Sequence, residues 1–270
     1  MEATMKNVLV LMHDDAGQEA RFQAAVDLTR GLDGHLRCID VAMVPAYMGD
    51  YADFGVSATL LADEQTRETA NRARMEARLK VEDLPYEWID QTGSPHECVR
   101  DASALADLVV LNRELDSSAY PDMRELVGDA VIKTGKPIVA VPQSAKGFDL
   151  YGHAVVAWDG SRVAEAALQA AIPLVKHAGT VTVLVVDEGA LRVPASAAAE
   201  YLSRHGMRPE VRIVPMGRNV GDTILEVLAA LKASYLVMGG FGHSRFLEAA
   251  FGGVTRRMLA HCPVPLVLAH

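Results

Sequence analysis

Cysteine is scarce in this chain, and its few cysteines do not form a recognisable site. Cys38, Cys98 and Cys262 are the three that occur, and they show neither a CxxC motif nor a Cys/His spacing of the kind that binds zinc. Each lies among apolar neighbours. We therefore expect small, buried hydrophobic side chains, without a redox role, in a reducing compartment such as the cytoplasm.

Long apolar runs and clusters of basic residues are missing as well. The apolar run at residues 8–12 is too short for a signal peptide or a membrane span, so we expect a cytoplasmic protein with no membrane partner. The net charge is −9, from 26 Lys and Arg against 35 Asp and Glu. Because binding to a phosphate backbone needs clustered Lys and Arg, nucleic acid is not an expected partner.

One order of predicted elements occurs twice along the chain. Residues 8–12 (VLVLM) and 155–158 (VVAW) are apolar runs that end in a polar turn and precede an apolar pattern typical of a helix. The further pairs of corresponding strands are predicted at 35–43 and 180–188, 86–93 and 210–217, and 136–142 and 264–270. Such an internal repeat determines the architecture.

Apolar strands that alternate with helices predict a parallel sheet with helices on both faces. With right-handed crossovers, each half becomes a doubly wound, Rossmann-like α/β domain of five strands. We place the domains at residues 1–145 and 150–270, joined by the polar segment QSAKGFDLYGH. The first half also carries a long predicted helix at 55–84. The loop at 44–55, which contains two Tyr and one Phe, is either a surface loop or a lid or interface.

A glycine cluster follows the predicted fourth strand of the second half. Gly239, Gly240 and Gly242 interrupt that strand, and Gly252 and Gly253 precede a predicted helix. Glycine allows a positive φ and a close approach to an anion, and a helix N-terminus adds free N–H groups. Ligands of open parallel sheets bind at this edge. The cluster matches neither the Rossmann fingerprint nor a P-loop, and on its own it fits ordinary turns or a phosphate cradle.

The spacing G-x2-G-x9-G, from Gly239 to Gly252, resembles that of the universal stress protein family. With the segments VVAWDGS and DTILEVL, the whole chain is similar to a tandem of two such domains. In the ATP-binding branch of that family, Ser or Thr follows the last glycine. Here Gly253 takes that position, whereas the next two family residues are kept as Val254 and Thr255. A hydroxyl contact to phosphate is therefore lost, although the backbone N–H remains.

This resemblance implies that residues 150–270 bind ATP, alone or with Mg²⁺, and serve a regulatory or stress-resistance role. It places Asp159 near adenine and ribose, and the backbone of Val185 against adenine. His243, in the glycine loop, would contact a phosphate or face solvent. The alternative is an interaction module whose ATP site has been lost.

The first half departs from the family pattern, and we expect no ATP binding there. His13 takes the position of Asp159, and Asn112 and Leu115 replace the first two motif glycines. The pair Gly128-Asp129 would put a carboxylate where the phosphates lie, which is unfavourable because like charges repel.

The run His13-Asp14-Asp15 has metal-binding residue types, but three adjacent residues after a strand rarely face one centre. We therefore expect an exposed turn and no metal site. No G-x-S-x-G or HExxH motif occurs, so we expect no catalytic residues and at most weak ATP hydrolysis. Within the family the final strands pair domains and subunits. We therefore expect the two halves to pair with each other, with a homodimer as a further step.

Overall fold

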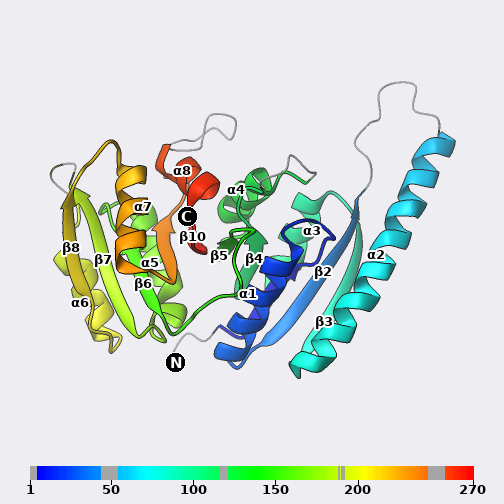
Figure 1. Ribbon diagram of the computed structural model, residues 1–270, viewed down its shortest axis with the longest axis horizontal. Coiled ribbons are helices and arrows are strands. Elements are labelled where there is room, and N and C mark those ends of the chain that lie inside the picture. Colours follow the sequence, from blue (N-terminus) through cyan, green and yellow to red (C-terminus); the bar gives the residue numbers. More distant parts are fainter. Residues whose placement is uncertain (1–4, 44–53, 116–120, 188, 190–191, 243–252) are drawn as a thin grey trace.

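Ten strands and eight α-helices make up the described part of the protein, with helices on both faces of the strands (Figure 1). The computed structural model describes residues 5–43, 54–115, 121–187, 189, 192–242 and 253–270. The strands are β1 (Asn7–Leu11), β2 (His35–Met43), β3 (Tyr86–Gly93), β4 (Leu108–Asn112), β5 (Ile138–Val141), β6 (His153–Ala157), β7 (Thr180–Asp187), β8 (Glu210–Pro215), β9 (Tyr235–Gly239) and β10 (Leu266–Ala269). The helices are α1 (Gln18–Gly31), α2 (Phe54–Glu82), α3 (Pro95–Ala102), α4 (Met123–Lys133), α5 (Arg162–Val175), α6 (Ala195–Arg204), α7 (Val220–Leu231) and α8 (Gly253–His261).

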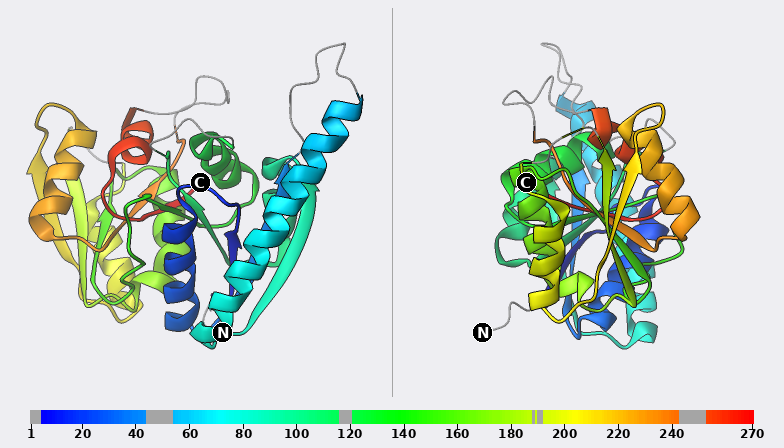
Figure 2. Two further views of the ribbon diagram at one scale, coloured as in Figure 1. Left: turned by 45° about the vertical axis from the view of Figure 1, so that its right-hand side comes forward. Right: turned by 90° about the vertical axis from the view of Figure 1, so that its left-hand side faces the viewer.

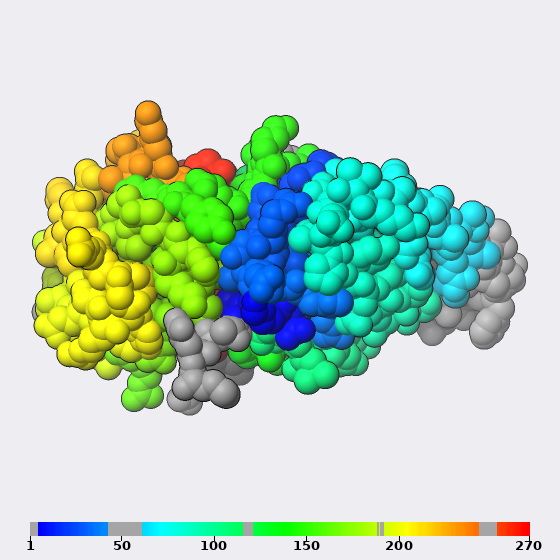
Figure 3. Space-filling model, turned by 90° about the horizontal axis from the view of Figure 1, so that it is seen from below, coloured from blue at the N-terminus to red at the C-terminus, as the bar shows by residue number. Residues whose placement is uncertain are grey.

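One sheet runs through both halves, in the order β3-β2-β1-β4-β5-β10-β9-β6-β7-β8. Within each half the neighbouring strands are parallel, whereas β5 and β10 pair antiparallel with Val139 opposite Val267. The prediction that the halves pair through their final strands is confirmed. The division into residues 1–145 and 150–270 stays a prediction, because the sheet is continuous across it. Figure 3 shows the first half, blue to cyan, and the second half, green to yellow, toward opposite ends of an elongated molecule.

The predicted doubly wound α/β fold is present in both halves, and both faces of the sheet are packed. Helices cover both faces of the sheet (Figure 2). One apolar core lies against α1, α2, α5 and α6, and a second lies on the other face against α3, α4, α7 and α8. The central strands β4, β5 and β10 are buried along their whole length. Strands covered on both faces need apolar residues at every position, which explains why they are continuous apolar runs in the sequence.

All three cysteines are buried and free, as predicted. Burial raises the pKa of the Cys262 thiol to about 11 and also raises that of Cys38. They are therefore packing residues held in the thiol form. Among the described residues, no helix combines the length and the apolar character needed to cross a membrane.

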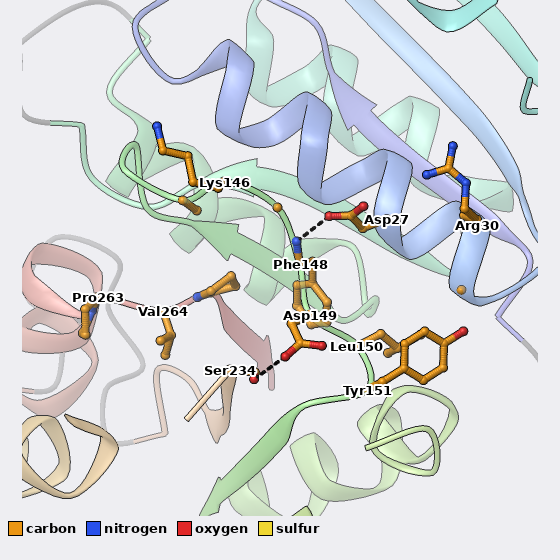
Figure 4. Close-up of a pocket in the computed structure, with 14 residues that line it drawn as sticks. Asp27, Arg30, Lys146, Phe148, Asp149, Leu150, Tyr151, Ser234, Pro263 and Val264 are labelled. Carbon is orange, nitrogen blue, oxygen red and sulfur yellow. Dashed lines mark hydrogen bonds between the residues drawn. The ribbon is translucent and has the colours of Figure 1, made fainter. Parts of the chain in front are cut away.

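The linker between the halves is fixed by contacts on both sides (Figure 4). On the first half, the Asp27 carboxylate accepts the N–H of Phe148 at 2.8 Å. On the second half, the Ser234 hydroxyl donates to Asp149 at 2.8 Å, and the Phe148 ring packs against Tyr235 with centroids 4.9 Å apart. A cavity of about 620 Å³ lies beside these residues. The linker thus packs against both halves at once.

Candidate functional site

A cavity of about 350 Å³ opens where β6, β7 and β9 end in the second half. It lies between these strand ends and the helices α5, α7 and α8. Its lining consists of Ala157, Trp158, Asp159, Ser161, Val163, Ala164, Leu184, Val186, Val220, Ile224, Met238, Gly239, Gly242, Gly253, Val254 and Thr255. The carboxyl edge of a parallel sheet is where ligands of such folds bind, so the cavity lies at the predicted place.

One wall of the cavity is apolar and comes from neighbouring elements. Leu184 and Val186 of β7 and Met238 of β9 line it from the sheet, and Ile224 lines it from α7. Since side chains alternate along a strand, Val185 between the first two points into the core on the opposite face of the sheet, where it is 3% exposed. The wall presents aliphatic and thioether surface, which suits one face of a planar ring.

Another part of the lining consists of glycines and the start of α8. Gly239 is needed for packing, because a Cβ there would lie 2.6 Å from the backbone carbonyl carbon of Val163 at the start of α5. A Cβ on Gly242 would lie 2.7 Å from Val163 Cγ2. The two glycines therefore let the chain after β9 pass directly over the N-terminus of α5, close to the cavity.

The expected positive φ does not fall on the glycines of this turn. In the described part of this turn the positive φ, 64°, belongs to Phe241. Gly239, Gly240 and Gly242 have other backbone conformations. The Phe241 side chain is 3% exposed and packs into the core of this face. Its burial holds the left-handed conformation that glycine would otherwise be expected to take.

The first turn of α8 faces the cavity with Gly253, Val254 and Thr255. N–H groups in a first helical turn have no partner within the helix, and they carry partial positive charge. The Arg257 guanidinium is tied to α7, with Nη2 2.7 Å from an oxygen of Asp222. Hydrogen bonds from Asn219 and Arg257 hold the pKa of Asp222 below its usual range. The helix end, and not this arginine, is thus the electropositive feature of the cavity.

Asp159 lies at the mouth of the cavity, just after β6. It is exposed, and its Oδ1 accepts the N–H of Ser161 at 2.9 Å. The Ser161 hydroxyl in turn accepts the N–H of Ala164 at 3.2 Å and caps α5. This turn holds a carboxylate beside the apolar wall, at a position where it can accept hydrogen bonds from hydroxyl groups of a ligand.

The structure brings together six of the predicted site residues: Asp159, Gly239, Gly242, Gly253, Val254 and Thr255. Gly240 is not in the lining, since its N–H donates to Ala269 and its carbonyl accepts from the ring of His270. His243 and Gly252 lie outside the described residues. The apolar wall was missed, although the alternation within residues 180–187 and the helical spacing within 220–231 could have indicated it.

A family model describing the universal stress protein family matches residues 150–270. The second half of the chain is therefore similar to universal stress protein domains. Its fold is similar to that of a universal stress protein from Archaeoglobus fulgidus DSM 4304, at 14% identity over 97% of this chain and 95% of that chain, with a TM-score of 0.73. A putative universal stress protein from Pseudomonas aeruginosa UCBPP-PA14 is similar at 13% identity over 98% of this chain and 93% of that chain, with a TM-score of 0.55. No curated protein matches the chain.

The first half has the same fold, but side chains fill the corresponding region. Arg21, fully buried on α1, donates to the carbonyls of Leu11 at 2.9 Å and His13 at 2.7 Å, to the Asp15 carboxylate at 2.9 Å, and to the amide oxygen of Asn112. In the ungapped alignment of the two halves Ala167 takes the position of Arg21, and Gly239 ends β9 as Asn112 ends β4. Long polar side chains thus occupy the space that small residues leave open there.

The prediction that Gly128-Asp129 puts a carboxylate where the phosphates would lie was wrong. These residues lie inside α4, where Asp129 pairs with Lys133, and the helix begins earlier, at Met123. The carboxylate at the helix start belongs to Asp122, which accepts the N–H groups of Arg124 at 2.9 Å and Glu125 at 3.2 Å. Because an N-cap aspartate fixes where a helix starts, the N-terminus of α4 already holds its own anion.

The expected exposed turn at residues 13–15 was also wrong. His13 is 3% exposed and lies 2.8 Å from Glu68, and Asp15 is buried against Arg21. α2 covers this turn and supplies Glu68. Burial, with the Glu68 carboxylate nearby, raises the pKa of Asp40 on β2 to about 9. Strong burial of charged groups at a strand end is typical of functional sites as well as of structural networks.

Proposed function

We propose that the second half binds an adenine nucleotide, ATP, and that its occupancy acts as a switch in a stress response. The observation that supports this most strongly is the pairing of two surfaces in one cavity. An apolar wall formed by Leu184, Val186 and Met238 and the open first turn of α8 line the same cavity.

The chemistry of a nucleotide fits both surfaces. A purine ring gains from contact with the apolar wall, since burying apolar surface is favourable by about 25 cal/mol per Å². Phosphates gain from the helix N-terminus, which offers N–H donors in a protein of net charge −9. Asp159 can accept hydrogen bonds from ribose hydroxyls. The cavity, at about 350 Å³, lies within the range of roughly 300–1,000 Å³ of small-ligand sites.

The residues that line the cavity favour binding of ATP over its hydrolysis. Asp159 is the one ionisable side chain among the described residues that line the cavity, and it sits at the ribose end of the proposed pose. A Mg²⁺ ion would be held mainly by the phosphates, because Mg²⁺ sites use one or two carboxylates at most and keep several waters. We therefore propose a regulatory nucleotide site with at most slow hydrolysis.

A tryptophan at Val186 tests the apolar wall. Val186 is part of the lining and only partly buried, so an indole there would occupy the space proposed for adenine. We expect Val186→Trp to weaken ATP binding at least about tenfold in calorimetry, equivalent to about 1.4 kcal/mol.

Ile213→Trp is the matched control for this variant. Ile213 lies on the neighbouring strand β8, opposite Val185, and its side chain is 65% exposed. Ile213 is not part of the lining, so the ATP affinity of Ile213→Trp should equal that of the unmodified protein. Equal affinity in both variants would place the nucleotide elsewhere. Absence of ATP binding to the unmodified protein would favour the interaction module with a lost site.

A further inference from the structure

A second cluster of ligand-type side chains lies in the first half, at the carboxyl end of β1. His13 follows β1, and Glu64 and Glu68 lie four residues apart on α2, so the two carboxylates share one face of the helix. One ligand atom from each of the three residues lies within 4.8 Å of the others. The three thus converge from two elements that are far apart in the sequence.

Two atoms of this cluster are buried without a proper partner. His13 Nδ1 and Glu68 Oε1 are 2.8 Å apart and their side chains are 4% and 5% exposed, yet neither makes a hydrogen bond of acceptable geometry. Asp40, on the adjacent strand β2, lies beside them and shares a side-chain hydrogen bond with Glu68. Buried polar atoms are almost always satisfied, because leaving them without a partner is costly. Two such atoms side by side, His13 Nδ1 and Glu68 Oε1, indicate a missing partner with positive charge.

The separation of these atoms suits a shared metal ion. Two ligands about 2.1 Å from one ion are about 3.0–3.4 Å apart at angles of 90–109°. The 2.8 Å between His13 Nδ1 and Glu68 Oε1 is close to this range. Glu64 is now held by Arg67, 2.8 Å from its Oε2, and its side chain is 14% exposed. One Glu64 oxygen lies within 4.8 Å of the ligand atoms of the other two residues.

Neighbouring amides hold the cluster in this arrangement. Asn71 Nδ2 donates to the carbonyl of Met12 at 2.7 Å and to Glu68 Oε2 at 3.3 Å, so the other oxygen, Oε1, is the one left facing His13. Gln18 Nε2 donates to the same Met12 carbonyl at 3.0 Å and to Asn71 Oδ1 at 2.8 Å. Hydrogen bonds of this kind orient the ligands in established metal sites.

We propose that His13, Glu64 and Glu68 bind one divalent transition metal ion, with Asp40 beside it. One imidazole nitrogen with carboxylate oxygens suits Zn²⁺ or Mn²⁺, whereas a site without nitrogen would suit Mg²⁺ or Ca²⁺. The ion would connect the end of β1 to α2. The half whose nucleotide region is filled by Arg21 would then carry a metal site, independent of ATP binding in the second half.

Calorimetry with zinc chloride or manganese chloride alone tests the proposal. Full-length protein is first freed of metal with a chelator and then titrated without nucleotide. We expect one ion per chain. Glu64→Gln should weaken binding at least about tenfold, since it removes a charged ligand. This variant should fold, because Glu64 lies on the partly exposed surface of a helix and glutamine is nearly the same size. Circular dichroism checks the fold.

Asp14→Asn is the matched control. Asp14 is adjacent to His13, but it pairs with Arg74 at 2.7 Å and is not a member of the cluster. The metal affinity of Asp14→Asn should therefore equal that of the unmodified protein. Cobalt(II) gives a second readout, because a four-coordinate nitrogen and oxygen environment absorbs visible light. The band should appear with the unmodified protein and with Asp14→Asn, and should be lost with Glu64→Gln. No binding to the unmodified protein, or equal affinity and absorption in Glu64→Gln, would overturn the proposal.

Discussion

Replacing Gly253 by aspartate is expected to abolish ATP binding while the fold survives. Gly253 starts α8 and lines the cavity, and a Cβ there would meet no atom of the described residues within 4 Å. An added side chain therefore meets no steric obstacle in the described part of the protein. Its charge would lie in the first turn of the helix, where the phosphates are proposed to bind.

The size of the effect follows from like-charge repulsion. Two unit charges about 4 Å apart interact by about 4 kcal/mol at an effective dielectric constant of 20. Allowing for solvent at the mouth of the cavity, we expect ATP affinity to fall at least about 100-fold. The first half provides a precedent, since Asp122 already caps α4 at the corresponding helix start. Isothermal titration calorimetry measures the loss, and the melting temperature checks the fold.

Two further substitutions at the same position separate charge from shape. Gly253→Asn has nearly the size of aspartate without its charge, so it should keep most of the affinity. Gly253→Ser restores the hydroxyl that the family pattern has at this position. Its bond to a charged phosphate should strengthen binding about tenfold, since such bonds contribute about 1.5–3 kcal/mol. If Asp and Asn weaken binding equally, the helix start is not the phosphate site.

The largest effect on stability is expected for Arg21→Met. Arg21 is fully buried, and its guanidinium satisfies the carbonyls of Leu11 and His13 and the carboxylate of Asp15, whose side chain is 6% exposed. Methionine fills much of the volume but leaves the carboxylate buried without its cation. Breaking a buried ion pair in this way costs about 3–5 kcal/mol of unfolding free energy.

Urea denaturation followed by circular dichroism measures this loss. Arg30→Met is the matched control on the same helix, because the Arg30 side chain is 52% exposed and pairs with Glu82 at the surface. Exposed pairs of this kind contribute about 0–1 kcal/mol. A loss below about 1 kcal/mol for Arg21→Met would show that Asp15 and the carbonyls find other partners. Removing the stranded charge, in Arg21→Met with Asp15→Asn, should restore part of the stability.

The repeat in the sequence was enough to predict most of the fold. The halves align without gaps at the first strand and helix, and apolar runs that alternate with helical patterns indicate a buried parallel sheet. Pairing through the final strands followed from the family resemblance, and β5 and β10 confirm it. The location of the glycine cluster was predictable for the same reason, since the fourth strand must end at the edge where the first and second strands end.

Contacts between residues far apart in the sequence were not predictable. The burial of His13 depends on α2, which arrives some 50 residues later and supplies Glu68. The conformation of Phe241 depends on the core that receives its ring. Neither effect has a local signal, because the sequence pattern near each residue is also that of an exposed turn or a flexible loop.

The two halves place a glycine on opposite sides of the same contact, which lies between the end of the fourth strand and the start of the first helix. In the first half the glycine is on the helix side, and a Cβ on Gly17 would lie 2.2 Å from Asn112 Oδ1 of β4. In the second half the glycine is on the strand side, and a Cβ on Gly239 would meet the backbone of Val163. The strand-side residue therefore projects over the helix only in the first half. Whether a glycine motif marks an open site therefore depends on the residue across the contact as well as on the glycine itself.

The number of ATP molecules bound per chain shows whether nucleotide binding is confined to the second half. The second half has the open cavity, and the first half has Arg21 and Asn112 in the corresponding space with Asp122 at the helix start. Titration of the unmodified protein with ATP in a calorimeter should therefore give one site per chain. Two equivalent sites, or none, would contradict the account.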